Sequence, residues 1–316
     1  MPYLPIINIT LTLIMALLSM AFFTLLERKI LGYIQLRKGP NKVSIMGIPQ
    51  PLADALKLLA KEQTKPSLAN LYPLMISPLS ALFLALLMWF LFPSSFPTHF
   101  FTYATLFMLA ISSLNVYTIL IAGWASNSKY ALMGSLRGIA QTISYEVSMA
   151  LTLLTSLMLL LSFDFSEIMI SKFSWILLIS LPTFLIWNAT MLAETNRTPF
   201  DLAEGESELV SGFNTEYSGG PFALIFMAEY TNILFMSILS TLFFTGNLPF
   251  PLLNQILFLV KIMFFAILFI WTRSAFPRFR YDRLMSICWK TFLPWVLASL
   301  ILVLSLSFIC SPLFLT

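Results

Sequence analysis

The chain has 316 residues, of which 59% are hydrophobic and 10% are charged, and its formal net charge is +4. A soluble domain of ordinary composition is about 45–50% apolar and about 25% charged. This chain therefore has too few polar residues to cover a water-exposed surface, and we expect lipid to cover much of it.

The residue counts also exclude the common redox centres of proteins. The chain has two cysteines, Cys288 and Cys310, and one histidine, His99. A structural zinc ion needs about four nitrogen or sulfur ligands, and an iron–sulfur cluster usually needs four thiolates. The glycine-rich nucleotide-binding patterns are absent from the sequence. We therefore expect no metal, no NADH site and no electron carrier in this chain.

The N-terminal stretch resembles a membrane span that is retained. No charged side chain occurs from Met1 to Leu26, and the basic residues follow this apolar stretch. A cleaved signal peptide has basic residues before a short apolar core, and a mitochondrial presequence is rich in Arg and Ser. We expect a first span that stays, in a protein inserted where it is made, either in a bacterium or inside an organelle.

Eight stretches are long and apolar enough to cross a bilayer, which takes about 20 mostly apolar residues. The second and third are the clearest, because no Asp, Glu, Lys or Arg occurs between Lys65 and Lys129. The sequence predicts an all-α, polytopic membrane protein that forms one membrane domain over residues 1–316. The expected spans are about 2–26, 68–92, 100–125, 138–163, 173–193, 217–245, 247–272 and 291–315.

The distribution of loop charge predicts the orientation. The connections after the first, third, fifth and seventh spans, with their flanks, hold 8, 2, 1 and 5 Lys or Arg, which is 16 of the chain's 18. Basic loops stay on the cytoplasmic side of a bacterial membrane or the matrix side of a mitochondrial one. Eight crossings put both termini on the opposite side. No internal repeat is visible, which disfavours transporter folds built from inverted halves.

The connection after the first span contains a predicted amphipathic helix at about 50–63. Leu52, Ala55, Leu56 and Leu59 recur at helical spacing, and Asp54 lies on the charged face. Such a helix is too short and too charged to cross and lies on the membrane surface. It either serves only as a headgroup anchor or roofs a cavity that opens from the bilayer. In the second case Asp54 lines that cavity.

The acidic loop at 194–216 is the most unusual segment. Its acids alternate with apolar residues, which indicates partial burial. Crowded, partly desolvated carboxyl groups hold protons at higher pH than isolated ones, so we expect proton exchange at working pH. The alternative is a docking surface for a soluble partner. The acids, set against a single Arg197, are Glu194, Asp201, Glu204, Glu206, Glu208 and Glu216.

Three ionisable residues fall inside predicted spans, namely Glu146 beside Tyr145, Glu229 beside Tyr230, and Lys261. Each charge costs roughly 2.5–3.5 kcal/mol on insertion scales, so pairing or transport must account for it. A Glu229–Lys261 or Glu146–Lys261 pair could hold helices together, but one carboxyl would be left over. A row of acids from the loop into the spans favours a proton relay.

Six blocks of the sequence resemble the signature blocks of NADH:ubiquinone oxidoreductase chain 1, a membrane subunit family of respiratory complex I. They occur in the family's order and cover the whole chain, and the long acidic block is the most specific of them. The blocks are Glu27–Asn41, Gln50–Glu62, Gly123–Val147, Leu192–Tyr217, Gly220–Asn232 and Pro277–Met285.

The resemblance implies an eight-helix subunit of a proton-pumping enzyme that oxidises NADH and reduces ubiquinone. NADH, FMN and the iron–sulfur clusters would be bound by partner subunits, with ubiquinone as substrate. At the positions that match the family's motifs, the resemblance implies that the membrane side of the quinone chamber is lined by Arg28, Asp54, Phe222, Phe226 and Arg273. The proton path would comprise Tyr145, Glu146, Glu194, Asp201, Glu204 and Glu229. Phe276 stands where many relatives have Tyr, which we interpret as a tuning difference.

The resemblance also implies a place and partners. The composition, rich in Phe and Leu, is similar to the mitochondrially encoded form, which implies the mitochondrial inner membrane, with the basic loops in the matrix and both termini in the intermembrane space. The implied partners are soluble quinone-site subunits of the redox arm, antiporter-like membrane subunits, ubiquinone and membrane lipids, with no nucleic acid. Two other classes of function stay open on the residues alone: a stand-alone ion or solute transporter, and a structural anchor for a redox arm.

Overall fold

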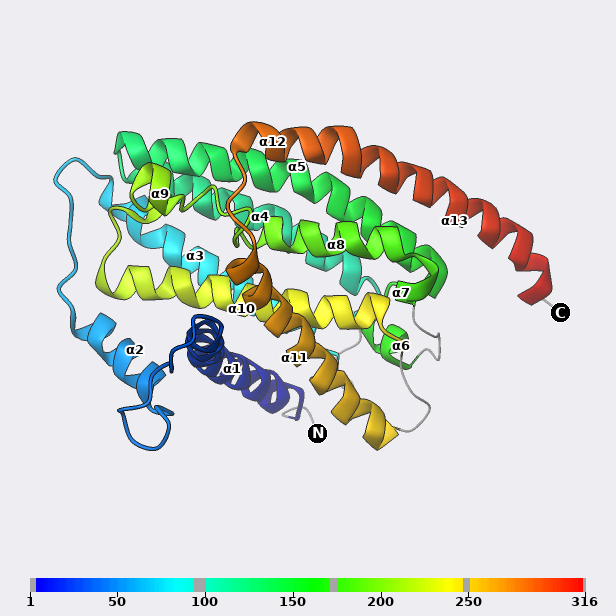
Figure 1. Cartoon of the computed structure of the whole chain (residues 1–316), viewed down its shortest axis with the longest axis horizontal. Helices are drawn as coiled ribbons and strands as arrows, with labels where there is room; N and C mark the ends of the chain where they lie inside the picture. Colours follow the sequence, from blue (N-terminus) through cyan, green and yellow to red (C-terminus); the bar gives the residue numbers. More distant parts are fainter. Residues whose placement is uncertain (1–3, 94–100, 171–175, 247–250, 315–316) are drawn as a thin grey trace.

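The computed structural model describes residues 4–93, 101–170, 176–246 and 251–314. These residues form helices and connecting turns, with no strand among them, which confirms the predicted all-α class (Figure 1). Seven of the described helical segments are long and apolar enough to cross a membrane. They are α1 (Leu4–Ile34), α3 (Leu71–Trp89), α4 (Ala104–Ala125), α5 (Lys129–Leu160), α10 (Gly219–Phe244), α11 (Pro251–Ala275) and the run from α12 (Tyr281–Ile287) through η2 (Cys288–Phe292) to α13 (Leu293–Phe314).

The span expected at 173–193 is a broken helix. Its described part comprises α7 (Ile176–Ile179) and α8 (Leu181–Glu194). Pro182 stands in the first turn of α8, where its missing N–H costs no helical hydrogen bond. Before this broken helix comes α6 (Phe165–Ile170), a single short helix that the sequence pattern did not predict.

Several helices extend beyond the apolar stretches that predicted them. The first helix continues past residue 26 to Ile34, and α5 begins at Lys129, nine residues before the expected start of its span. The last helical run begins at Tyr281, ten residues before the expected position. The reason is that backbone hydrogen bonds continue a helix wherever the residues permit it, whereas hydropathy marks only the part within lipid.

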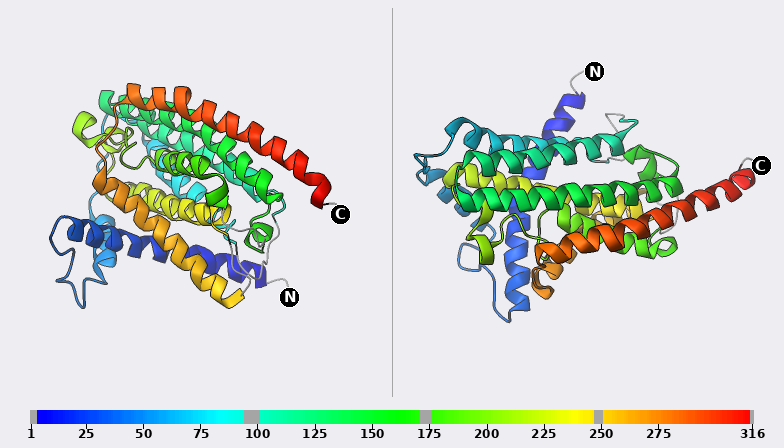
Figure 2. Two further views of the ribbon diagram at one scale, coloured as in Figure 1. Left: turned by 45° about the vertical axis from the view of Figure 1, so that its right-hand side comes forward. Right: turned by 90° about the horizontal axis from the view of Figure 1, so that it is seen from above.

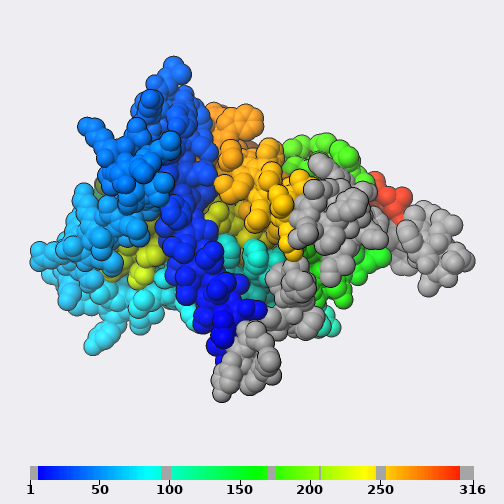
Figure 3. All heavy atoms as spheres, turned by 90° about the horizontal axis from the view of Figure 1, so that it is seen from below, coloured from blue at the N-terminus to red at the C-terminus, as the bar shows by residue number. Residues whose placement is uncertain are grey.

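Helix α10 is the centre of the bundle. It packs against α3, α11 and α1, and its last two turns are buried on all sides. Helices α3, α4 and α5 follow one another side by side, and α5 also packs against α8 and α13 (Figure 1). The first helix crosses the direction shared by these helices at a steep angle (Figures 2 and 3). The central position of α10 brings the connections after α1, α8 and α11 together near its N-terminal half.

The predicted amphipathic helix is α2 (Gln50–Ala60), which ends three residues before the expected boundary. It contacts α1 and α10 at the basic end of the bundle (Figure 1). Leu52, Leu56 and Leu59 are more than 60% exposed. This apolar stripe is the surface that such a helix presents to the acyl-chain boundary of a bilayer.

Two short helices shape the acidic loop after α8. They are α9 (Glu206–Leu209) and η1 (Gly212–Asn214). Gly212 has φ +56, and a Cβ added there would lie 1.9 Å from the carbonyl oxygen of Ala203. Only glycine allows both this left-handed backbone and this close approach. The loop is thereby folded back against α5 and α4 and does not extend into solvent as a free acidic segment.

Candidate functional site

A carboxylate that the sequence reasoning overlooked organises the basic end of the bundle. Glu27 of α1 is 3% exposed. It accepts hydrogen bonds from Arg197 Nη2 at 2.7 Å on each oxygen and from the hydroxyl of Tyr230 at 2.6 Å. Arg273 of α11 also pairs with it. Because two guanidinium groups and a phenol converge on it, Glu27 joins α1, α10, α11 and the connection after α8.

The sequence contains a signal for the burial of Glu27. Ala16, Met20 and Phe23 are buried on α1 and recur at helical spacing. Glu27 continues this stripe four residues after Phe23, so it lies on the face of α1 that packs inward. The adjacent Arg28, which the motif singled out, points to a different and more exposed face.

Two of the residues expected to line the quinone chamber form an ion pair. Arg28 of α1 pairs with Asp54 of α2, and Gln50 Nε2 donates to the other Asp54 oxygen at 3.0 Å. Both charged side chains are partly exposed, so the pair contributes at most about 1 kcal/mol to stability. Its structural effect is to hold the amphipathic helix against α1, one residue away from the Glu27 cluster.

The two predicted phenylalanines lie against each other on α10. The ring centroids of Phe222 and Phe226 are 4.5 Å apart, and that of Phe226 is 6.4 Å from the ring of Tyr230. A line of aromatic rings therefore runs along α10 to the Glu27 cluster. With Arg273 bound to Glu27, the structure brings the five predicted quinone-lining residues into one region at the basic end of α1, α2, α10 and α11.

Three of the predicted proton-path acids lie together on the other side of Arg197. The carboxyl of Glu229 on α10 lies beside that of Glu204, and Asp201 lies within Coulombic range. Arg278 Nη2 lies 3.2 Å from Asp201 Oδ2, and Asn214 Nδ2 donates to Glu204 Oε1 at 2.9 Å. Two neighbouring carboxyl groups can share a hydrogen bond when one of them carries a proton. This cluster can therefore hold and release a proton.

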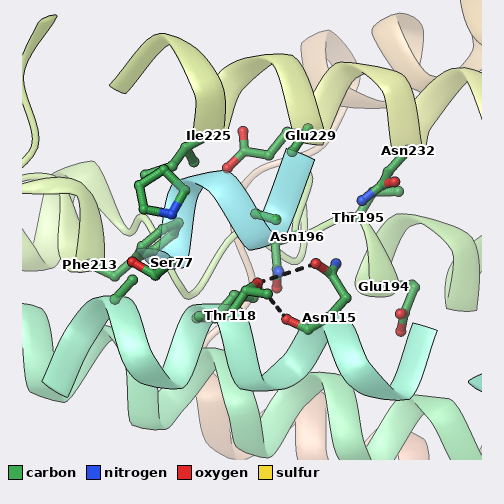
Figure 4. A pocket seen from close by; sticks show the side chains of 15 residues that line it. Ser77, Asn115, Thr118, Glu194, Thr195, Asn196, Phe213, Ile225, Glu229 and Asn232 are labelled. Atoms are coloured by element: carbon green, nitrogen blue, oxygen red, sulfur yellow. Dashed lines mark hydrogen bonds between the residues drawn. The ribbon is translucent and has the colours of Figure 1, made fainter. Parts of the chain in front are cut away.

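Glu194, at the end of α8, lies in a cavity with Glu229. The cavity has a volume of about 50 Å³ and lies between α3, α4, α10 and the connection after α8. We call it the acid pocket; Figure 4 shows Glu194 and Asn232 near one end and Ser77 and Phe213 near the other. Glu194 is 8% exposed, and its buried Oε2 has no hydrogen-bond partner among the described residues. Since one water needs roughly 10–15 Å³, the pocket has room for more than one.

The other two predicted members of the path lie on α5. Glu146 is within Coulombic range of Glu194. Tyr145 is fully buried, and its hydroxyl donates to the carbonyl of Leu284 at 3.5 Å, while its ring contacts Phe200 and Phe292. The carboxyl series thus runs from the Glu204–Glu229 pair through the acid pocket to Glu146, whereas Tyr145 packs against the α12–η2 segment.

Lys261 has a structural contact far from these acids. Its Nζ donates to the carbonyl oxygen of Gly246 at 2.6 Å, just beyond the C-terminal end of α10. Glu229 lies in the middle of α10, about 22 Å from Phe244 at 1.5 Å per residue. The Glu229–Lys261 pair considered from the sequence is therefore excluded. A cation at this position instead stabilises the C-terminal end of a helix.

The comparisons with known proteins decide the family. The family model described as NADH dehydrogenase matches residues 7–304. The chain belongs to the NADH dehydrogenase family. Among its relatives, NADH-ubiquinone oxidoreductase chain 1 of Aedes aegypti is 52% identical over 98% of this chain and 99% of its own length. The proteins of that name from Heterololigo bleekeri and Pongo pygmaeus are 54% and 53% identical, over 90% and 94% of this chain and 91% and 94% of their own lengths.

Membership of this family confirms the resemblance found in the six sequence blocks. The chain is a multi-pass membrane protein of the family. No group of three or more His, Cys, Asp or Glu side chains that could hold a metal ion occurs among the residues the structure describes. The described ionisable groups are suited to moving protons and to orienting a polar ligand.

Proposed function

We propose that this chain is the membrane subunit of a proton-pumping NADH:ubiquinone oxidoreductase that forms the membrane part of the quinone chamber. The enzyme activity belongs to the assembled complex, with NADH, FMN and iron–sulfur clusters on partner subunits. The proposed lining residues are Arg28, Asp54, Phe222, Phe226 and Arg273. We further propose that the carboxyl series is the first part of the proton path, made of Tyr145, Glu146, Glu194, Asp201, Glu204 and Glu229.

One observation supports the coupling of the two parts. Arg197 is bound to Glu27 on the quinone side, lies with Cζ 4.9 Å from the ring centre of Tyr230, and is within Coulombic range of Glu229 on the acid side. Although burial opposes its charged form, the Glu27 carboxylate raises the pKa of Arg197. The guanidinium therefore stays positively charged, and it lies between the proposed quinone chamber and the Glu204–Glu229 pair.

The proposed mechanism follows from this arrangement. Reduction of ubiquinone adds two electrons and two protons to the headgroup. While the electrons have arrived and the protons have not, the headgroup near Arg273 and Glu27 carries negative charge. Any shift of Arg197 toward the quinone side removes positive charge from the neighbourhood of Glu229. The shared proton of the Glu204–Glu229 pair then redistributes, and the acid pocket transmits the change to Glu194 and Glu146. The antiporter-like subunits would complete translocation.

The orientation follows from loop charge. With 16 of 18 Lys and Arg in the connections after alternate predicted spans, we place these loops in the matrix and both termini in the intermembrane space. The mitochondrial inner membrane is the proposed location, in keeping with the animal relatives. The redox arm would dock on the basic face, over the Glu27 cluster.

Replacing single acids of the series by the uncharged Gln tests the proton path. Glu229→Gln and Glu146→Gln should leave NADH oxidation with an artificial acceptor intact in the assembled complex, while impairing ubiquinone reduction or proton pumping. Glu208→Gln is the matched control, because Glu208 is an exposed acid whose described partner is Arg137 at 2.8 Å. Full coupled activity in both test variants would defeat the proposed path.

Two other functions make different predictions. A stand-alone transporter would be active alone in vesicles, whereas this subunit should co-purify with iron–sulfur proteins. A purely structural anchor would not contact quinone, so a photoreactive quinone analogue would label neither the 27–62 nor the 220–232 region. Labelling in either region supports the chamber.

A further inference from the structure

A second and larger cavity lies near the acid pocket. It has a volume of about 470 Å³ and lies where the connection from α2 to α3 passes the N-terminal ends of α3 and α10 (Figure 1). Its wall is formed largely by apolar side chains such as Leu71, Tyr72 and Met75, and Lys65 and Glu216 also line it. We call this cavity the vestibule. It is partly open at the basic end of the bundle.

A small apolar cluster separates the vestibule from the acid pocket. Leu74 and Tyr217 of this cluster line the vestibule, whereas Ile119, Phe213 and Ile225 line the acid pocket. These side chains are all buried. Apolar side chains of this kind disfavour the passage of water and protons, because neither enters hydrocarbon readily without polar partners.

One polar contact passes through this layer. The hydroxyl groups of Ser77 and Tyr217 are 2.8 Å apart, and their residues are 2% and 7% exposed. Ser77 lines the acid pocket, and Tyr217 lines the vestibule. The hydroxyl pair therefore reaches from one cavity to the other. Figure 4 shows Ser77 at the end of the acid pocket away from Glu194.

We propose that the Ser77–Tyr217 hydroxyl pair is the proton entry from the basic-side vestibule to the buried carboxyls. A hydronium ion in the vestibule gives a proton to the Tyr217 oxygen and becomes water, as the Tyr217 O–H proton passes to Ser77. Ser77 then releases its own proton to a carboxylate that lines the acid pocket, Glu229 or Glu194. Each hydroxyl gains one proton and loses one, so neither carries a lasting charge. The inference rests on the proposed carboxyl path and names the side from which it is supplied.

The hydrogen bonds around the pair allow this direction. The Ser77 hydroxyl can donate to the carbonyl of Leu74 at 3.4 Å, which leaves its oxygen open to accept the Tyr217 O–H; the Ser77 O–H must then turn from Leu74 toward the acid pocket to pass its proton on. Burial raises the pKa of the Tyr217 phenol, against a lowering by the bond with Ser77. The phenol therefore stays neutral at working pH and passes protons without accumulating charge.

The vestibule is held in place at its polar end. The backbone N–H of Thr64 donates to the hydroxyl of Ser218 at 2.9 Å, and the two hydroxyl groups are 2.7 Å apart. These bonds tie the connection after α2 to the start of α10, next to Tyr217. The cavity thus keeps a fixed relation to the hydroxyl pair, which a proton-transfer route of two short steps requires.

Removing one hydroxyl at a time tests the entry in the assembled complex. Tyr217→Phe and Ser77→Ala should each lower ubiquinone-reductase turnover on the order of tenfold to a hundredfold, since positioned proton-transfer groups contribute factors of that size or more. The slowed turnover should show a larger solvent deuterium isotope effect than wild type. Ser77→Thr keeps the hydroxyl and should retain most of the turnover. NADH oxidation with an artificial acceptor reports that each variant is assembled.

If Tyr217→Phe fails to assemble, a substitution that fills the vestibule tests the entry independently, again with turnover as the measurement. Met75→Trp places a bulky side chain in the vestibule, whereas Leu79→Trp adds the same bulk one turn further along α3, at an exposed position outside its lining. Only the first should slow turnover. Wild-type turnover and isotope effect in Ser77→Ala would overturn the proposal, as would equal losses in Ser77→Ala and Ser77→Thr. If Glu229→Gln is impaired while Tyr217→Phe is not, the entry is wrong and the carboxyl path stands.

Discussion

Replacing Glu27 by Gln isolates the charge that holds the basic end of the bundle together. The substitution keeps the shape of the side chain and one carbonyl oxygen for Tyr230, but it removes the charge that faces Arg197 and Arg273. Breaking a buried ion pair by removing one partner costs about 3–5 kcal/mol. Arg197 would be left largely buried without its carboxylate, so the connection after α8 should open more often.

Hydrogen–deuterium exchange measures this opening directly. The backbone N–H of Arg197 donates to the carbonyl of Leu192 at 3.0 Å, so its exchange reports whether this connection stays closed. A loss of 3–5 kcal/mol corresponds to roughly a hundredfold to a few thousandfold faster exchange of that amide, at 1.4 kcal/mol for each factor of ten. Peptides covering 195–205, resolved by mass spectrometry in the purified complex, provide the assay.

Glu208→Gln is the matched control for this experiment. Glu208 also pairs with an arginine, but its side chain is 55% exposed. Exposed pairs contribute about 0.2–1 kcal/mol, so exchange near Glu208 should change by no more than about fivefold. If Glu27→Gln and Glu208→Gln gave equally small changes, Glu27 would not be the organising charge that the contacts indicate.

Two further substitutions test the acidic loop and the aromatic wall. Gly212→Ala should abolish assembly of the subunit on a native gel, because the added Cβ would lie 1.9 Å from a carbonyl oxygen. Gly205 also has a positive φ, but a Cβ added there would lie 3.4 Å from its nearest atom. Gly205→Ala should therefore cost only about 1–2 kcal/mol. Equal assembly of both variants would contradict the close packing of the loop. Phe226→Ala should raise the KM for ubiquinone severalfold with little change in artificial-acceptor activity. Phe264→Ala, at an exposed position on α11, should leave this KM unchanged. An unchanged KM in Phe226→Ala would remove this ring from the proposed chamber.

Hydropathy predicted the helices best where charge is absent. In the uncharged stretch between Lys65 and Lys129, the predicted ends of the two spans lie within four residues of the observed ends of α3 and α4. Prediction was poorer where a helix continues into charged residues, as at Lys129 and Tyr281, because nothing in hydropathy marks the end of a helix outside lipid. The span expected at 173–193 is present, but its break between α7 and α8 and the short α6 were not predicted.

The sequence indicated which residues to propose for the site but not how they contact one another. The sequence blocks indicated the acids and the quinone-side residues, and the structure brings Glu204, Glu229 and Asp201 together. The sequence could not indicate that Arg197 binds Glu27, because these residues are 170 positions apart and meet only after α1 packs against α10. The Ser77–Tyr217 pair was missed for the same reason, since a serine in an apolar helix has no distinguishing signal.

Infrared difference spectroscopy of quinone reduction tests the central claim most directly, namely that chemistry at the chamber changes the protonation of carboxyls in this chain. Reduction of bound ubiquinone in the assembled complex should change the carboxyl C=O absorption. Glu229→Gln should remove part of that change, and Glu208→Gln should leave it intact. A carboxyl signal identical in wild type and Glu229→Gln would contradict the account.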